Sequence, residues 1–300
     1  MADDQLLRDL GRRAMLGDGG MGTQLIEAGM TTADCGVLWN ADRPEAIRAV
    51  HERYLDAGCE LLTSNSFQGS RTALSMHGLS ERAGELNRLA AEIARGAAGD
   101  RALVLADVGP FGGFLEPLGE TSESELTDIF TEQFAALREG GADVALVETM
   151  SDPGEVGVAV GAARAVDADW PIIATLAYQK AGDQFTTMMG TTAAEATARA
   201  IEAGAGIVGA NCGTDLDLDD YARLVEAVAV AADGAPVMIQ PNAGSPRREG
   251  DSVVYPATPD EMADLVPRLL DAGATIIGGC CGTTPNHLLA MGQAMRLHVA

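Results

Sequence analysis

The sequence predicts an α/β fold, specifically a single (β/α)8 barrel of the TIM type in which residues 1–300 form one domain. Short apolar runs occur eight times, at intervals of roughly 30–45 residues, and helical patterns fill the segments between them. Eight is also the number of strands that closes such a barrel. Chains of 300 residues commonly form one α/β barrel, and no linker or change in composition indicates a second domain.

The predicted strands are short and apolar, which is typical of a parallel sheet that is covered on both faces. They are Ala14–Leu16, Glu60–Thr63, Ala102–Ala106, Val144–Val147, Pro171–Leu176, Ile207–Val208, Pro236–Ile239 and Thr275–Ile277. Strands that alternate with helices predict a parallel sheet. A doubly wound open sheet is the alternative, but no Gly-x-Gly-x-x-Gly motif follows the first predicted strand.

Helices are predicted where apolar residues recur at three- and four-residue spacing. These segments are Pro44–Leu55, Arg82–Ala97, Ser124–Glu139, Ala193–Glu202, Leu218–Ala232 and Pro259–Leu270. Four of them end in a glycine-containing phrase that a strand follows at once, at 56–58, 139–142, 202–204 and 271–273. Glycine is the residue that most readily adopts the left-handed conformation of a helix C-cap, so we expect these four helices to end there.

Composition and charge narrow the class of partner and the compartment. The formal net charge is −24 and the acidic residues are dispersed, which argues against nucleic acids and anionic membranes as partners. No apolar run approaches the roughly 20 residues of a membrane span, and the polar N-terminus is unlike a secretory leader. We therefore expect a cytoplasmic protein. In a reducing compartment, a cluster among the five cysteines indicates a metal or catalytic site rather than disulfide bonds.

Two adjacent cysteines, Cys280 and Cys281, lie in a glycine-rich turn directly after the last predicted strand. Neighbouring cysteines rarely form a disulfide with each other, whereas two thiolates can share a soft metal ion such as Zn²⁺. Cys212 follows the sixth strand, two positions away around the ring, so all three sulfurs can meet above the barrel mouth. The other two cysteines lie outside this pattern and are expected to be small buried apolar residues: Cys35 and Cys59.

A site with three sulfur ligands leaves one position of a tetrahedral zinc ion open, as catalytic zinc sites do. A substrate thiol bound at that position is held as a thiolate at neutral pH. A thiolate is a good nucleophile toward a methyl group, so the pattern indicates chemistry on a thiol.

Two carboxylates also follow predicted strands: Asp18 after the first and Glu148 after the fourth. They could act as an acid–base pair, as metal ligands, as turn or helix caps, or as anchors for an ammonium group. Anchoring an amine fits best, because sulfur already supplies the metal ligands and no histidine ends a strand. The backbone N–H groups of Gly19 and Gly20 could bind a carboxylate, so a thiol-bearing amino acid would satisfy the whole set.

Through these residues and the phrases around them, the chain resembles the homocysteine S-methyltransferase family. That family includes the homocysteine domain of cobalamin-dependent methionine synthase, betaine–homocysteine methyltransferase and enzymes that use S-methylmethionine. The matching phrases occur in order along nearly the whole chain, at residues 18–25, 44–47, 54–58, 63–67, 109–110, 147–149, 209–213 and 278–283.

The resemblance implies a zinc-dependent (β/α)8 barrel enzyme that methylates the sulfur of homocysteine to give methionine. It further implies that Asn242, after the seventh strand, can occupy the fourth zinc position until substrate arrives; a turn-forming asparagine is the alternative. It assigns the zinc ligands to Cys212, Cys280 and Cys281. It assigns the contacts with the substrate amine to Asp18 and Glu148.

The methyl donor follows less directly from the resemblance. The betaine branch builds an aromatic cage around its quaternary ammonium, but here Gln68 and Thr149 occupy two positions where that branch has tyrosine. Trp39 and Phe67 could form only a partial cage. The strand phrase that contains Asn65 is more similar to the methionine synthase branch, and we predict that Asn65 also contacts the substrate.

We therefore expect a stand-alone homocysteine module whose methyl donor is a methylcorrinoid carried by a separate protein. The folate- and cobalamin-binding domains of the methionine synthase branch do not fit within 300 residues. Direct transfer from betaine or a sulfonium compound is the alternative. A non-catalytic zinc- or thiol-binding subunit of a corrinoid methyltransferase complex is a hypothesis of another class, and a different thiol acceptor is a third.

Overall fold

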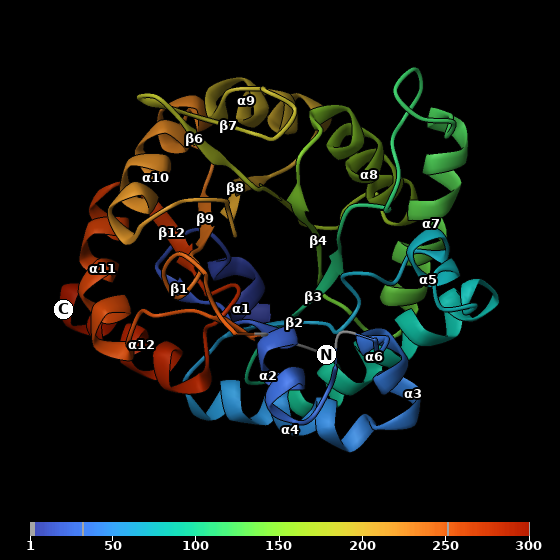
Figure 1. Cartoon of the computed structure of the whole chain (residues 1–300), viewed down its shortest axis with the longest axis horizontal. Coiled ribbons are helices and arrows are strands. Elements are labelled where there is room, and N and C mark those ends of the chain that lie inside the picture. Colours follow the sequence, from blue (N-terminus) through green and yellow to red (C-terminus); the bar gives the residue numbers. More distant parts are fainter. Residues whose placement is uncertain (1–3, 32, 251, 300) are drawn as a thin grey trace.

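The computed structural model describes residues 4–31, 33–250 and 252–299, and its main feature is a barrel of eight parallel strands seen end-on in Figure 1. Around the ring the strands run in the order β1, β12, β9, β8, β5, β4, β3 and β2. Their bounds are β1 Met15–Leu16, β2 Leu61–Thr63, β3 Leu103–Val108, β4 Val144–Met150, β5 Ile172–Leu176, β8 Ile207–Asn211, β9 Val237–Gln240 and β12 Ala274–Ile277.

The ring is closed between β1 and β2 by a short parallel pairing of Gly17 with Leu61. Glu60 donates its backbone N–H to the carbonyl of Leu16 at 2.8 Å, and Asp18 donates to the carbonyl of Leu61 at 3.1 Å. All eight predicted strands are present, so the (β/α)8 prediction is confirmed.

Helices surround the strand ring on its outside (Figure 1). Those that follow the eight strands in turn are α4 Pro44–Asp56, α6 Ala83–Ala98, α7 Glu123–Glu139, α8 Pro153–Val166, α9 Ala193–Ala203, α10 Leu218–Ala232, α11 Pro259–Asp271 and α12 Pro285–Val299. Short helices precede the barrel or lie in its loops: α1 Asp4–Asp9, α2 Met21–Glu27, α3 Trp39–Asp42 and α5 Arg71–Ser75. The six predicted helices agree with the structure to within one residue at each end.

The sequence patterns missed two barrel helices and two hairpins. Helix α8 is rich in alanine, valine and glycine, so its sequence carries only a weak contrast between an apolar and a polar face. Helix α12 also mixes apolar and polar residues without a clear apolar stripe. The antiparallel hairpins are β6 Gln179–Ala181 with β7 Gln184–Thr186, after β5, and β10 Arg247–Glu249 with β11 Ser252–Val254, after β9.

Glycine ends the four predicted helices in the expected conformation. The backbone φ is +95° at Gly58, +95° at Gly141, +108° at Gly204 and +111° at Gly273. Residues with a Cβ atom adopt these angles only with strain. The chain therefore turns sharply at these points and enters the next strand within a few residues.

The core has two layers, because side chains of each strand alternate between the barrel interior and the helices outside. The interior layer holds Met15, Leu61, Leu103, Leu105, Val144, Leu146, Ile173, Ile207, Met238 and Ile276. Leu6, Leu7 and Leu10, in and just after α1, pack against this layer. The last apolar interior residues of β3, β4 and β9 are Leu105, Leu146 and Met238. The residues two positions further along these strands point into the barrel mouth: Asp107, Glu148 and Gln240.

Four strands run further at their carboxyl ends than predicted, because those ends carry polar residues. Strand β3 continues to Val108, β4 to Met150, β8 to Asn211 and β9 to Gln240. Hydrophobic runs locate only the apolar part of a strand, so the polar mouth falls outside them. The extensions hold four polar residues of the mouth on regular backbone rather than on loops: Asp107, Glu148, Asn211 and Gln240.

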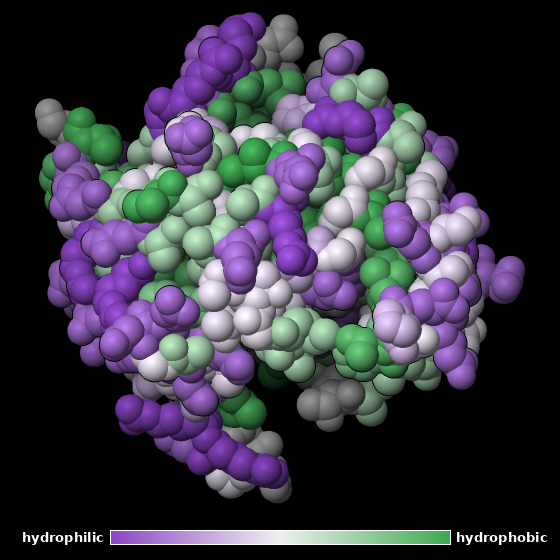
Figure 2. Space-filling model, turned by 90° about the horizontal axis from the view of Figure 1, so that it is seen from above, coloured by the Kyte–Doolittle hydropathy of each residue, from purple (hydrophilic) through white to green (hydrophobic). Residues whose placement is uncertain are grey.

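The surface is mainly hydrophilic, with small apolar areas scattered among polar side chains on the face shown in Figure 2. Within the described part of the chain, no helix is both long and apolar enough to cross a membrane.

Candidate metal centre and active site

Three cysteine sulfurs converge at the mouth of the barrel. Cys212 follows β8 directly, and Cys280 and Cys281 lie in the turn after β12. The three Sγ atoms lie within 4.8 Å of one another, and those of Cys280 and Cys281 are 3.9 Å apart. Among the described residues, this is the one group of three or more cysteine, histidine or acidic side chains close enough to share a metal ion. Three soft sulfur donors match the ligands that zinc accepts, so the group could hold a metal.

Hydrogen bonds among the thiols concentrate negative charge on one sulfur. The thiols of Cys280 and Cys281 donate to the sulfur of Cys212, and this lowers the pKa of Cys212 far below its usual range. The same interactions raise the pKa of Cys280 and of Cys281. Cys212 is therefore the cysteine of the three that loses its proton most readily, and all three would be deprotonated when a metal binds.

Two neighbouring turns hold the cysteines in place. Cys212 adopts φ +54°, an angle that is uncommon for residues other than glycine and is often found at functional sites. The buried hydroxyl of Tyr221, on α10, donates to the carbonyl of Cys212 at 2.7 Å and accepts from the N–H of Asn242 at 3.2 Å. Tyr221 thereby connects the turn after β8 to the turn after β9.

Replacing Tyr221 by Phe is expected to weaken metal binding about 10- to 100-fold, which is the typical effect of removing a group that orients a metal ligand. The loss would also leave a buried carbonyl and a buried N–H unpaired, so the free energy of unfolding should fall by about 1–3 kcal/mol. Competition with a chelator measures the first effect and urea unfolding of the metal-free protein measures the second. A variant that is less stable but binds metal as tightly as the parent would contradict the orienting role.

Asn242 lies beside the three sulfurs. Its side-chain Nδ2 is 3.7 Å from the sulfur of Cys212, and its Oδ1 accepts from the backbone N–H of Cys281 at 3.1 Å. The side chain is buried. Its role as that ligand remains a prediction.

Two carboxylates, the buried Asp18 and the half-buried Glu148, face the same mouth. Asp18 accepts from the backbone N–H of Thr63 at 2.8 Å and from its hydroxyl at 2.7 Å. Glu148 accepts from the Nε2 of Gln240 at 2.9 Å. Burial raises the pKa of Asp18 to about 7 and the pKa of Glu148 to about 7, and the charge of Glu148 adds to the shift at Asp18. Such groups need a positive ligand to be ionised at low cost.

The glycines before α2 allow the chain to pass close to the cysteine turn. A Cβ on Gly19 would lie 2.7 Å from the Thr283 hydroxyl, and one on Gly20 would lie 2.7 Å from the carbonyl of Cys280. The N–H of Gly20 already donates to the Thr283 hydroxyl at 3.0 Å. A substrate carboxylate would have to share or replace that hydrogen bond at Gly20.

Asn65 follows β2 and supports the loop that covers this side of the barrel. Its Nδ2 donates to the carbonyl of Gly36 at 2.8 Å and to Oδ1 of Asn40 at 3.0 Å. Both amide hydrogens are thus engaged within the protein, and its predicted contact with substrate would have to use the side-chain oxygen.

Sequence patterns did not assign a role to three residues that the structure places in or beside the mouth. They are Asp107 at the end of β3, Asn211 at the end of β8, and Tyr221 on α10. Asn211 accepts from the N–H of Thr149 at 3.0 Å and from the Thr175 hydroxyl at 2.9 Å, which joins three strand ends. Asp107 and Asn211 could have been found from strand alternation, but no sequence signal marks Tyr221.

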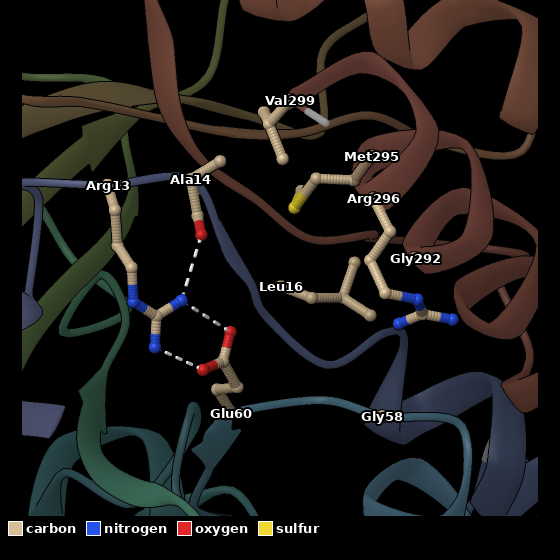
Figure 3. Close-up of a pocket in the computed structure, with 9 residues that line it drawn as sticks. All are labelled: Arg13, Ala14, Leu16, Gly58, Glu60, Gly292, Met295, Arg296 and Val299. Atoms are coloured by element: carbon tan, nitrogen blue, oxygen red, sulfur yellow. Dashed lines mark hydrogen bonds and ion pairs between the residues drawn. The ribbon is translucent and has the colours of Figure 1, made fainter.

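A cavity of about 610 Å³ lies at the opposite end of the barrel, between the start of β1, the start of β2 and α12 (Figure 3). The guanidinium of Arg13 reaches across to the carboxylate of Glu60, and Leu16 and Met295 supply apolar surface. Because it opens at the amino ends of the strands, this cavity is separate from the cysteine site.

The fold and the mouth together define a (β/α)8 barrel with a sulfur-rich candidate metal centre beside two carboxylates, the buried Asp18 and the half-buried Glu148. The chain belongs to the homocysteine S-methyltransferase family, whose sequence profile matches residues 15–295.

Relatives agree with this assignment, and solved structures share the fold. The chain is 32% identical, over 98% of its length, to methionine synthases of Mycobacterium leprae and Mycobacterium tuberculosis, and it spans 25% of the length of each. The metallated form of the homocysteine methyltransferase MmuM from Escherichia coli has a similar fold, with a TM-score of 0.76 and 24% identity, covering 96% of this chain and 99% of that one. A methyltransferase from Methanosarcina mazei shares the fold at a TM-score of 0.56 and 10% identity, covering 96% and 95% respectively.

Proposed function

We propose that this chain is a single homocysteine-binding domain that catalyses zinc-dependent methyl transfer to the thiol of homocysteine, giving methionine. The observation that carries the proposal is the convergence of three sulfurs and two carboxylates at one barrel mouth. A thiol-bearing amino acid offers a sulfur to the first group and an ammonium to the second. Free cysteines throughout the described chain fit a reducing compartment such as the cytoplasm.

Cys212, Cys280 and Cys281 would hold the zinc ion, with Asn242 as the ligand that substrate displaces. Bound zinc would supply the Lewis acidity that keeps a substrate thiol ionised at neutral pH. Asp18 and Glu148 would bind the ammonium group and so direct the substrate sulfur toward the cysteines. The ordered strand ends would contribute to catalysis by holding the sulfur in one orientation for attack on the methyl group.

We propose a methylcorrinoid, bound outside these residues, as the methyl donor. Two observations support this choice over betaine. Trp39 is only 6% exposed, and the guanidinium of Arg43 already lies 4.3 Å from its ring centroid, so its face is not open to a second cation. The ring of Phe67 packs so closely on Gly109 that a Cβ atom on Gly109 would lie 2.5 Å from the ring. This side of the Phe67 ring is therefore covered as well.

Exposed apolar side chains near the mouth also favour a macromolecular donor. Phe114, in the loop after β3, is 58% exposed, and Met188, after the β6–β7 hairpin, is 70% exposed. Both line a shallow pocket of about 190 Å³ at the carboxyl side of the strands. Apolar residues that gather on a surface often mark protein interaction sites.

A donor panel tests the proposal. Zinc-loaded protein is incubated with homocysteine and, separately, methylcobalamin, glycine betaine, S-methylmethionine or dimethylsulfoniopropionate, and methionine is quantified. We expect methionine from methylcobalamin, with at least a tenfold lower rate from the other donors. Faster turnover of betaine or a sulfonium compound would replace the corrinoid proposal with direct transfer. Tight zinc and homocysteine binding without turnover of any donor would favour the non-catalytic subunit.

A further inference from the structure

A polar layer lies directly above the apolar interior of the barrel, and one carboxylate in it has no partner for one of its oxygens. Leu103 and Leu105 of β3 point into the interior, whereas Val104 and Ala106 pack against the helices. Strand alternation therefore directs the next interior position, Asp107, toward the mouth. Asp107 is only 3% exposed, and its Oδ1 is buried without a hydrogen-bond donor.

Asp107 lies on β3, between β2, whose Thr63 holds Asp18, and β4, which carries Glu148. In the sheet, Leu105 pairs with Thr63, whose side chain holds Asp18, and Asp107 pairs with Leu146, two residues before Glu148. Ser64 accepts from the N–H of Asp107 at 3.1 Å, and Ser66 donates to its carbonyl at 2.7 Å. The backbone of Asp107 is thus fixed while part of its carboxylate is left for a ligand.

The protein supplies no cation to this layer. None of Asp18, Asp107 and Glu148 forms an ion pair within residues 4–31, 33–250 and 252–299. The charges of Glu148 and Asp18, together with burial, raise the pKa of Asp107 well above its usual range.

A second unpartnered atom in the layer is also an acceptor. The Oε1 of Gln240 is buried without a donor, while its Nε2 donates to Glu148. Buried acceptors of this kind are costly unless a ligand donates to them. An ammonium group has three N–H donors and a positive charge, so it can satisfy these acceptors and offset the charge of the carboxylates at once.

We propose that Asp107 is a specificity-determining residue that accepts a hydrogen bond from the ammonium group of the substrate, as a third carboxylate beside Asp18 and Glu148. The proposal rests on the proposed function, because it assumes that the substrate is an amino-acid thiol. It goes beyond that function by assigning the selection of amine-bearing thiols to a residue on β3. Thiols without an amine would leave the acceptors of this layer unpaired and bind weakly.

The test compares two thiols that differ only in the amine: homocysteine and 4-mercaptobutanoate. Binding to the cobalt-substituted protein is followed by the sulfur-to-cobalt charge-transfer absorption, which requires no methyl donor. Asp107→Asn keeps the size of the side chain and removes its charge. We expect this variant to raise the Kd of homocysteine about 10- to 100-fold and to change the Kd of 4-mercaptobutanoate by less than about twofold.

Glu155→Gln is the matched control. Glu155 is a buried carboxylate on α8 that accepts from the N–H of Phe111 at 2.8 Å. This variant should bind both thiols like the parent. Equal losses for both thiols in Asp107→Asn, or no loss for homocysteine, would overturn the role of Asp107. A parent protein that binds both thiols equally would instead overturn the amino-acid substrate itself, and with it this inference.

Discussion

Replacing Cys280 by Ala is expected to abolish stoichiometric zinc binding and to lower homocysteine methylation by at least about 100-fold, while the barrel still folds. The sulfur of Cys280 is one of three within 4.8 Å of one another, so its loss leaves two sulfur ligands. Loss of a group that merely orients a metal ligand costs 10- to 100-fold, and loss of a ligand itself should cost more. Metal content per protein chain and initial rates of methionine formation measure the two effects.

The fold should survive, because the cysteine turn lies at the mouth and outside both core layers. None of the three sulfurs belongs to the interior or outer apolar clusters. Far-UV circular dichroism and the urea midpoint of the metal-free variant should match those of the metal-free parent. Cys35→Ala is the control, because Cys35 is a free, partly buried cysteine that packs against a separate small cluster near Val37 and Leu86. A Cys280→Ala variant with full zinc content and full activity would refute the proposed centre.

One observation, the count of eight strands, predicted both the barrel and the clustering of the three cysteines. Once the strands are placed, Cys212 and the pair Cys280–Cys281 must lie at the same end of the ring. The cysteines do converge there, within 4.8 Å. A regular fold thus converts positions far apart in the sequence into neighbours in a way that strand counting can follow.

Contacts made by particular side chains could not be predicted in the same way. The motif that contains Asn65 indicated a substrate contact, yet its two amide hydrogens are engaged with Gly36 and Asn40. Tyr221 lies in the middle of an ordinary amphipathic helix, and only its three-dimensional position shows that it joins two turns of the site. The missing donor at Asp107 is likewise a property of packing, which no motif encodes.

The geometry of the mouth also indicates how the proposed site could bind two kinds of cation. The cysteines collect negative charge on sulfur, which suits a metal ion, and the carboxylates collect it on oxygen, which suits an ammonium group. Gln240 donates to Glu148, and the charge of Cys212 raises the pKa of Glu148. The cysteines and the carboxylates are therefore electrostatically linked.

Asp18→Asn is expected to weaken homocysteine binding about 10- to 100-fold and, in the absence of ligand, to stabilise the protein at pH 8. The first effect follows from the loss of a charged hydrogen-bond acceptor for the ammonium group. The second follows from burial, which raises the pKa of Asp18 from 3.8 to about 7. Because the folded state holds this proton more tightly than the unfolded state, Asp18 costs stability that grows as the pH rises from about 4 to about 7 and is largest above that range.

The pH dependence gives this prediction a quantitative limit. A shift of one pKa unit corresponds to about 1.4 kcal/mol, so a shift of about 3 units sets a ceiling of about 4 kcal/mol on the gain at pH 8. At pH 4 the variant and parent should unfold at similar urea concentrations. The measurement is the free energy of unfolding of the metal-free proteins at both pH values, beside the Kd of homocysteine for the metal-loaded proteins.

Glu155→Gln separates the two effects, because burial also raises the pKa of Glu155 to about 7 but the residue lies outside the polar layer. This control should gain stability at pH 8 without losing affinity for homocysteine. An Asp18→Asn variant that binds homocysteine as tightly as the parent would remove Asp18 from the amine site. A variant that loses affinity without gaining stability at pH 8 would show that the pKa of Asp18 is not raised in the ligand-free mouth, because groups other than substrate offset the cost of burying its charge.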